Sequence, residues 1–471
     1  MNILEAINDS LLFKPFLQDG KGDTSTWANW EVALRALYGL PIIHSSNRRL
    51  VQECTGRKVS TLPDDGFKTA LFLTGRRSGK SRIASVIGAY EAILAQREKK
   101  LAKGERGIVP IISPSKNQSR VIRDYMRAIF EVPMLANEIV RETKEGFELR
   151  GGTRIEILAG DWRTVRNFTC LAVIVDEAAF FGYTEESKVK SDTELIRAIQ
   201  PSLATVGGRL IAISSPYARK GWTWSQYKRH YGNGNGSTLV WNCPSRTLNP
   251  TLPQSVIDEA MTEDLAAAKS EYMGEFRDDV AIFLPREVIE QQVIAGRKEL
   301  LPRGEISYFA FVDLSGGRAD DAALAIAHRD ERKVVVDFVK RYRPPFNPYK
   351  IIADMVQEIG RYRIRSVVGD NYAAEFVAQA FTSHGLTYRK SEKPKGGLYL
   401  ELLPRLCSGE IELLDIETLI TQLANLERRT RSGGKDIIDH PPGLHDDLAN
   451  VVAGVADVSV RPQRNVGNPM F

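Results

Sequence analysis

The chain has 471 residues, of which 43% are hydrophobic and 26% are charged, and its formal net charge is +5. These values describe an ordinary globular protein of about two to three domains. The four cysteines are scattered without a CxxC pair, which excludes a zinc ribbon and a disulfide framework and favours a reducing cytoplasm; no apolar run approaches the roughly 20 residues of a membrane span.

Residues 1–66 predict helices and loops that precede the first strand. Trp27, Trp30 and Leu37 fall at helical spacing, so most of these side chains are expected in the core. Contact with an adenine ring is the alternative for an aromatic side chain of this segment, or for Gln18.

A short apolar run leads into the stretch Thr74-Gly75-Arg76-Arg77-Ser78-Gly79-Lys80-Ser81, after which a helix is predicted from Arg82. This order favours a phosphate-binding loop, because the glycines let backbone N–H groups face a triphosphate and the helix N-terminus adds a positive field. Lys80 can reach the outer phosphates, and the Ser81 hydroxyl can hold Mg²⁺. The usual pattern has glycine where this chain has Thr74, so a Gly-Lys-Ser turn formed by chance is the alternative.

The segments after the loop predict alternating helices and strands, at 82–99, 107–113, 115–129, 146–158 and 171–177. The last of these strands ends in Asp176 and Glu177, and an apolar run that ends in acids is typical of a buried parallel strand whose carboxyl end carries chemistry. Asp176 would hold Mg²⁺ through water, and Glu177 would orient an attacking water. The alternative is an ordinary strand that ends in a solvated acidic turn.

A further apolar strand at 209–216 ends in Ser214 and Ser215. Their hydroxyls are candidates to sense a γ-phosphate, although Ser-Ser-Pro is also a common strand terminator. The polar, aromatic and glycine-rich stretch 217–236 predicts a mobile loop, and 255–276 predicts a helix. Prolines, Gly304 and charged residues then indicate a connector and a domain boundary.

The second half predicts an antiparallel meander, a helix, a strand and two further helices, at 308–339, 349–362, 365–370, 373–384 and from 443. Asp313 lies in the first strand, Asp370 ends a later strand, and Asp446 and Asp447 stand near the start of the last helix. Three carboxylates from separated segments are what a two-metal phosphodiester site needs. Helix capping is the alternative for the last two acids, and a structural role is expected for His445.

The order of these motifs resembles the large terminase subunit of tailed double-stranded DNA phages over nearly the full chain. The resemblance rests on residues 74–81, on Val-Ile-Val-Asp-Glu-Ala at 173–178, Ile-Ser-Ser-Pro at 213–216 and Glu-Tyr-Met-Gly-Glu-Phe at 271–276, and on Val-Asp at 312–313, Gly-Asp at 369–370 and His-Asp-Asp-Leu-Ala at 445–449. It implies an α/β fold, with an ASCE-type P-loop ATPase on a mainly parallel sheet joined to an RNase H-like nuclease domain. The implied divisions are a helical segment at 1–66, the ATPase at 67–276, a connector at 277–304, the nuclease at 305–460 and a flexible tail at 461–471.

The resemblance also implies roles for two arginines. Arg76 would sense the γ-phosphate, and a second arginine would act from a neighbouring subunit. Arg166 is the best match for this second arginine and Arg163 is its rival; the family commonly has glycine after it, where this chain has Asn167.

Other residues acquire roles through the same resemblance. Ser214 and Ser215 would form the motif that couples ATP hydrolysis to movement. Asp313, Asp370 and Asp447 would be the nuclease acids, with Asp446 as a further metal ligand.

The implied activity is that of a viral DNA-packaging motor, which hydrolyses ATP to translocate double-stranded DNA into a procapsid and cuts concatemeric DNA with a two-metal endonuclease. The expected cofactors are ATP and Mg²⁺, with Mn²⁺ able to replace Mg²⁺ in the nuclease. The expected partners are double-stranded DNA, the portal protein, the small terminase subunit and further copies of the chain in a ring, without a membrane, in the cytoplasm of the bacterial host. Two alternatives stay open: a cellular P-loop helicase or repair ATPase with an attached nuclease, and a non-catalytic, ATP-gated DNA-binding assembly protein.

Overall fold

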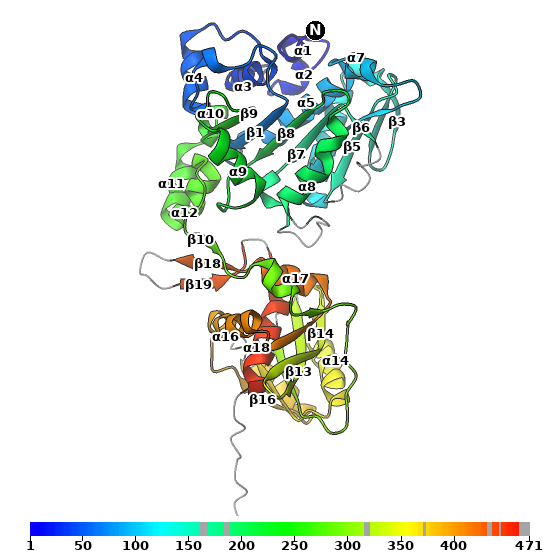
Figure 1. Cartoon of the computed structure of the whole chain (residues 1–471), viewed down its shortest axis with the longest axis vertical. Helices are drawn as coiled ribbons and strands as arrows, with labels where there is room; N and C mark the ends of the chain where they lie inside the picture. The colour runs from blue at the N-terminus through cyan, green and yellow to red at the C-terminus, as the bar shows by residue number, and fades with distance from the viewer. Residues whose placement is uncertain are drawn as a thin grey trace, which may run out of the picture. The chain divides into compact units, whose positions relative to one another are not determined.

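The computed structural model describes residues 1–160, 165, 168–182, 189, 191–314, 321–370, 374–430, 436–441 and 444–460. The chain divides into two compact units, Met1–Asp278 and Asp279–Phe471 (Figure 1). Among the described residues, no helix is both long enough and apolar enough to cross a membrane.

The described part of the first unit is built around a nine-stranded sheet in the order β3-β4-β5-β2-β7-β8-β1-β9, with β6 paired to β2. The strands are β1 (Thr69–Thr74), β2 (Gly107–Ser113), β3 (Ile139–Glu142), β4 (Gly146–Leu149), β5 (Arg154–Ala159), β6 (Thr169–Cys170), β7 (Ala172–Asp176), β8 (Arg209–Ser214) and β9 (Thr238–Cys243). Only the pairs β3–β4 and β4–β5 among these described strands are antiparallel. The predicted mainly parallel sheet is therefore confirmed.

Helices surround this sheet (Figure 1). They are α1 (Ile3–Asn8), α2 (Lys14–Leu17), α3 (Ala28–Tyr38), α4 (Ser45–Thr55), α5 (Lys80–Ile93), α6 (Lys116–Phe130), α7 (Pro133–Ala136), α8 (Asp192–Ile199), α9 (Gly221–His230), α10 (Ser245–Leu248), α11 (Gln254–Glu263) and α12 (Leu265–Ala268). Short 3₁₀ segments are η1 (Ser25–Trp27), η2 (Val59–Thr61), η3 (Arg97–Lys100), η5 (Ala178–Phe180) and η6 (Gln200–Leu203), and the segment η7 (Lys269–Met273) is π-helical. Leu71 and Phe72 of β1 are both fully buried but belong to different hydrophobic clusters. Successive strand residues thus pack on opposite faces, which explains why β1 reads as an unbroken apolar run.

Two local predictions for the first unit are wrong. The stretch 217–236, predicted as a mobile loop, contains α9. The carboxylate of Asp192 accepts hydrogen bonds at 2.9 Å from the backbone N–H groups of Trp222 and Thr223, so a long-range partner caps this helix. The helix predicted over 255–276 is broken into α11, α12 and η7, because the side chain of Asp264 caps a new helix start.

The second unit contains a seven-stranded sheet in the order β11-β17-β14-β13-β12-β15-β16 and a three-stranded sheet in the order β10-β18-β19, among its described residues. The strands are β10 (Val280–Ile282), β11 (Val293–Ile294), β12 (Tyr308–Asp313), β13 (Ala322–Asp330), β14 (Lys333–Tyr342), β15 (Ser366–Gly369), β16 (Thr387–Lys390), β17 (Ile411–Leu414), β18 (Glu427–Thr430) and β19 (Asp436–Asp439). β12, β13 and β14 form the predicted antiparallel meander, and β15 and β16 continue parallel to β12. This meander with two added parallel strands, in the order β14-β13-β12-β15-β16, is the arrangement of the predicted RNase H-like fold.

Helices cover both faces of the seven-stranded sheet. They are α13 (Arg286–Glu290), α14 (Pro348–Arg361), α15 (Ala374–Ser383), α16 (Lys395–Ser408), α17 (Glu417–Ala424) and α18 (Asp447–Val460). Residues of α16 and α18 share one hydrophobic cluster with one face of the sheet, and residues of α14 and α15 share another with the opposite face. The segment predicted as a connector, 277–304, contains β10, α13 and β11, and each of these two strands pairs within the second unit.

Candidate active sites

The loop between β1 and α5 is held by close backbone contacts. Gly79 has a φ of +87°, and a Cβ atom there would lie 2.9 Å from the ring of Trp27. A Cβ atom at Gly75 would lie 2.2 Å from the hydroxyl of Ser245. Because other residues would clash at both positions, the two glycines are required by this loop conformation.

Side chains from three segments fix the rest of the loop. The hydroxyls of Thr74 and Ser78 lie 2.8 Å apart, and the indole N–H of the buried Trp30 donates to the carbonyl of Ser78 at 2.7 Å. Asn249 donates to the carbonyl of Arg77 at 2.8 Å, where the backbone has a left-handed φ of 65°. The Thr74 position, unusual in sequence, is thus used to tie the loop to the end of its strand.

A cavity of about 630 Å³ lies over this loop and is lined by Arg76, Arg77, Ser78, Gly79, Lys80 and Ser81. Gln18 and Trp27 line the same cavity, so two of the adenine candidates from 1–66 border the space where a nucleotide would lie. Tyr125 of α6, which the sequence did not single out, is a further aromatic side chain on its wall.

The Lys80 ammonium makes its hydrogen bonds inside the site. It donates to the carbonyls of Thr74 at 3.3 Å and Gly75 at 3.1 Å, and to the hydroxyl of Ser215 at 3.0 Å. It also lies 3.8 Å from a carboxylate oxygen of Glu177. The side chain is 6% exposed, so a bound phosphate has to replace these contacts in a poorly solvated place where charge interactions are strong.

Ser81 and Asp176 meet as a magnesium site requires. The Ser81 hydroxyl donates to Oδ2 of Asp176 at 3.1 Å, while the buried Oδ1 has no hydrogen-bond partner among the described residues. Burial raises the pKa of Asp176 to about 7, and the charge of Glu177 adds to this shift, whereas Lys80 and Ser81 oppose it. A buried carboxylate oxygen without a partner next to a hydroxyl fits a divalent cation.

Glu177 contacts the end of the neighbouring strand β8. Its Oε2 lies 3.4 Å from both the hydroxyl of Ser214 and the backbone nitrogen of Ser215. Its backbone φ is 50°, a conformation rare outside glycine that concentrates at functional sites. Since β8 lies between β1 and β7, the two serines touch both the lysine of the phosphate loop and the acid of the Asp-Glu strand.

Arg76 lines the same cavity but is paired with an acid. Its guanidinium lies 3.1 Å from a carboxylate oxygen of Glu271 on η7, and its backbone N–H donates to the carbonyl of the same residue. The Arg76 side chain is 63% exposed, so this ion pair is weak and open to exchange for a phosphate. The predicted second arginine, Arg166, and its rival Arg163 lie outside the described residues.

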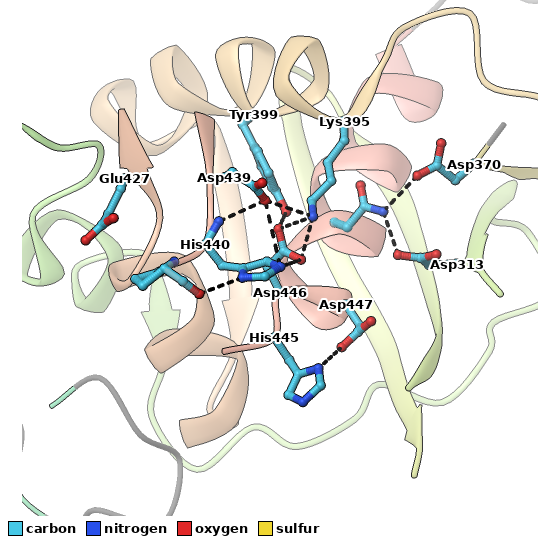
Figure 2. A network of polar contacts seen from close by, with 12 residues as sticks. Asp313, Asp370, Lys395, Tyr399, Glu427, Asp439, His440, His445, Asp446 and Asp447 are labelled. Atoms are coloured by element: carbon cyan, nitrogen blue, oxygen red, sulfur yellow. Dashed lines mark hydrogen bonds and ion pairs between the residues drawn. The ribbon is translucent and has the colours of Figure 1, made fainter. Parts of the chain in front are cut away.

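The second unit brings together acids from separate segments (Figure 2). Val312 and Gly369 are paired in the parallel strands β12 and β15, so Asp313 and Asp370 follow at the same edge of the sheet. Asn450 of α18, which sequence reasoning missed, donates to Oδ2 of Asp313 at 2.7 Å and lies 3.5 Å from Oδ2 of Asp370.

Asp447 completes this cluster from the start of α18. Burial raises the pKa of Asp313 to about 7, and the charges of Asp447 and Asp370 raise it further, against the hydrogen bond from Asn450. Burial raises the pKa of Asp447 to about 6, with an added contribution from Asp321. A cation relieves the repulsion among close carboxylates. Oδ2 of Asp447 is buried and has no hydrogen-bond partner among the described residues, although Nδ1 of His445 lies 3.8 Å away, so these acids fit divalent metal.

Asp446 lies in a different environment from its neighbour. Oxygens of its carboxylate lie 2.6 and 2.7 Å from Nζ of Lys395, and one accepts from the buried Tyr399 hydroxyl at 2.7 Å (Figure 2). Lys395 also donates to Asp439 at 3.2 Å, and His440 lies 3.7 Å from Asp446. A lysine neutralises Asp446, and no lysine pairs with Asp447 in the described structure. The geometry therefore favours Asp447 over Asp446 as the acid that joins Asp313 and Asp370 in holding a cation.

His445 lies near a potential metal-binding group. Donor atoms of Asp321, His445 and Asp447 lie within 4.8 Å of one another, although Asp321 also pairs with Arg341. Asn450 had a usable signal in the sequence, because it stands three residues after Asp447 and therefore on the same helix face. Asp321 had none, since the fold alone brings it to the helix.

No protein-family profile and no curated protein matches the sequence. The structure is similar to that of the HK97 bacteriophage large terminase, at 14% identity and a TM-score of 0.38, over 92% of this chain and 99% of that chain. It is also similar to the large terminase of a thermophilic bacteriophage in complex with ADP, at 10% identity and 0.39 over 91% of this chain and 98% of that one. The large terminase nuclease of thermophilic phage G20c with bound magnesium matches at 15% identity and 0.33, over 36% of this chain and 94% of that one.

All three solved structures are of phage large terminases, the family that the sequence motifs of this chain resemble.

Proposed function

We propose that this chain is the large terminase subunit of a tailed double-stranded DNA phage, which hydrolyses ATP to move DNA into a procapsid and cuts concatemeric DNA. One observation carries the proposal: a phosphate loop whose serine meets a buried acid in the first unit, in the same chain as converging carboxylates in the second. Neither site alone would favour a packaging enzyme over a simple ATPase or nuclease.

In the first unit, the loop N–H groups and Lys80 would bind the phosphates of ATP, and Ser81 and Asp176 would hold Mg²⁺. Glu177 orients the attacking water, and Arg76 exchanges Glu271 for the γ-phosphate. An arginine from a neighbouring subunit, for which Arg166 is the candidate, completes the charge stabilisation.

Coupling to DNA movement starts at the end of β8. Ser214 and Ser215 contact Glu177, and Ser215 also contacts Lys80. A change at the γ-phosphate therefore reaches β8 directly through two charged side chains. The strand is the element whose shift moves bound duplex DNA.

In the second unit, Asp313, Asp370 and Asp447 would hold divalent metal, and Asp446 is the candidate for a further ligand. Two such ions, Mg²⁺ or Mn²⁺, would supply an activated water and charge stabilisation of the leaving oxygen. The residues of the chain position the ions, and Lys395 keeps the extra acid, Asp446, neutralised.

The remaining parts of the proposal concern organisation. The ATPase comprises 1–276 and the nuclease 305–460, and the chain works in the cytoplasm of the bacterial host. It binds double-stranded DNA, the portal protein and the small terminase subunit, and it forms a ring when docked.

Two substitutions on the intact chain test the two halves. Glu177→Gln should abolish ATP turnover but spare nucleotide binding, because the amide keeps the shape of the side chain without its charge. Asp370→Ala should abolish EDTA-sensitive plasmid cleavage in Mn²⁺ and keep ATP turnover. Each variant is the control for the other.

Normal turnover by the first variant, or persistent metal-dependent cleavage by the second, would contradict the assignment. Separation of the strands of a short duplex would favour a helicase instead. A wild-type chain that neither hydrolyses ATP nor nicks plasmid would favour the non-catalytic assembly protein.

A further inference from the structure

The side chain of Asn450 is fully buried between the acids of the second unit. It lies on α18, one turn after Asp447, and its nitrogen Nδ2 faces Oδ2 of Asp313 at 2.7 Å and Oδ2 of Asp370 at 3.5 Å. Figure 2 labels the two carboxylates, Asp313 and Asp370, at which these contacts end. One amide nitrogen therefore faces both acids at once.

The oxygen of the same amide is unsatisfied. Oδ1 of Asn450 is buried and has no hydrogen-bond partner among the described residues. A buried acceptor left without a donor costs about 1–3 kcal/mol, so such an orphan atom needs an explanation. The residue's own backbone N–H is not a donor for this oxygen, because it donates to the carbonyl of Asp446 at 2.8 Å.

The orientation of the amide follows from the charges around it. Two carboxylates repel an amide oxygen and attract the NH₂ group, so without a cation the nitrogen faces Asp313 and Asp370. A divalent cation between these acids reverses the preference, because it repels NH₂ and coordinates amide oxygen. A half-turn about the terminal side-chain bond, a torsion with a broad and nearly two-fold profile, exchanges the two atoms.

We propose that Asn450 is a switching ligand: its nitrogen bridges Asp313 and Asp370 in the cation-free protein, and its oxygen coordinates the cation that these acids hold. The inference rests on the proposed nuclease function, since it concerns the same site. It accounts for the bridging contacts and for the orphan oxygen together, whereas a purely structural bridge accounts only for the first.

Calorimetric titration of the full chain with Mn²⁺ tests this, because the two roles predict opposite signs. The nuclease-site binding is defined as the part of the heat that Asp370→Ala removes. If Asn450 is a ligand, Asn450→Ala weakens this binding at least tenfold. If the amide only bridges the acids, it competes with the cation, and the same variant binds Mn²⁺ as tightly as wild type or more tightly, which would overturn the inference.

A matched control lies on the same helix. Ser459 is buried on α18, and its hydroxyl donates to the carbonyl of Val455 at 2.6 Å, away from the acids. Ser459→Ala should leave the Mn²⁺ affinity unchanged. An equal loss in this control would show that the Asn450→Ala effect arises from damage to the helix, and would refute the ligand role.

A second variant covers the case in which Asn450→Ala fails to fold. Asn450→Asp removes the bridging donor but keeps an oxygen. Mn²⁺ should therefore raise the melting temperature of this variant more than the melting temperature of wild type. An increase no larger than in wild type would also overturn the inference. The same titrations separate this inference from the proposed function. If wild type and Asp370→Ala take up Mn²⁺ identically, the nuclease site itself is wrong, whereas a normal wild-type site with unimpaired Asn450→Ala refutes the switching ligand alone.

Discussion

Removing the charge of Asp313 should stabilise the cation-free protein at alkaline pH. Burial raises the pKa of this carboxyl to about 7 from an ordinary 3.8. The folded protein thus holds a proton that the unfolded chain releases. The contribution of this carboxyl to the free energy of unfolding is therefore fully present below about pH 4, declines as the pH rises to about 7 and is constant above that. The difference between the pKa in the folded protein and the ordinary pKa corresponds to about 4 kcal/mol of stability. Because the side chain is partly exposed to solvent, we expect an effect of about 2 kcal/mol.

Asp313→Asn removes this cost while keeping an oxygen that can accept the hydrogen bond from Asn450. The free energy of unfolding in EDTA should therefore rise by about 2 kcal/mol at pH 8 and by less than about 1 kcal/mol at pH 5. Urea unfolding followed by circular dichroism measures it. All six tryptophans lie in the first unit, so their fluorescence reports that unit separately and isolates the transition of the second.

Magnesium and a surface control complete the test. Excess Mg²⁺ should remove most of the stability advantage of Asp313→Asn, because Mg²⁺ binds the folded wild type and stabilises it, whereas the variant binds the cation weakly. Asp330→Asn, at an exposed strand end in the same unit, should change stability little at either pH. A gain for Asp313→Asn that is absent at pH 8, or equal at both pH values, would refute the account of a buried, repelled carboxylate.

Two further substitutions probe residues that support the proposed nuclease site. A Cβ atom at Gly454 of α18 would lie 2.4 Å from the ring of Phe311, so Gly454→Ala should lower the free energy of unfolding by about 1–3 kcal/mol. Gly360 has open space around it, so Gly360→Ala should not lower it. Equal effects of the two substitutions in urea unfolding would contradict the close-packing argument. Lys395→Met leaves the buried Asp446 without its paired ammonium group and should lower the free energy of unfolding by about 3 kcal/mol. The added change Asp446→Asn should restore most of this loss. A double variant as unstable in urea as the single one would show that the ion pair is not the cause.

The strand elements were predictable because their signals are local. A strand buried on both faces reads as an apolar run, and β2, Gly107–Ser113, lies where the sequence predicts it. The helix α9 was missed because its N-terminus is capped by Asp192, thirty residues away, and no local pattern encodes that partner. Local composition there, rich in glycine and polar residues, indicates a loop.

In the first unit, the order of the motifs could be predicted from the sequence, but the contacts between them could not. The Gly-Lys-Ser loop and the Asp-Glu strand end each carry a recognisable pattern. That Ser214 and Ser215 stand between them follows from the strand order β7-β8-β1, which only the packed sheet fixes. The pairing of Arg76 with Glu271 likewise joins segments far apart in the chain.

For the second site, the residue pattern predicts acids at strand ends and at a helix start, in an order that resembles a known nuclease. It could not separate Asp446 from Asp447, because neighbours at a helix start point about 100° apart and the partner of each depends on what packs there. The tertiary structure places Lys395 and Tyr399 on Asp446, which favours Asp447 as the candidate cation ligand. It also placed Asn450 between two acids, since carboxylates gathered in a poorly solvated place need either a donor or a cation between them.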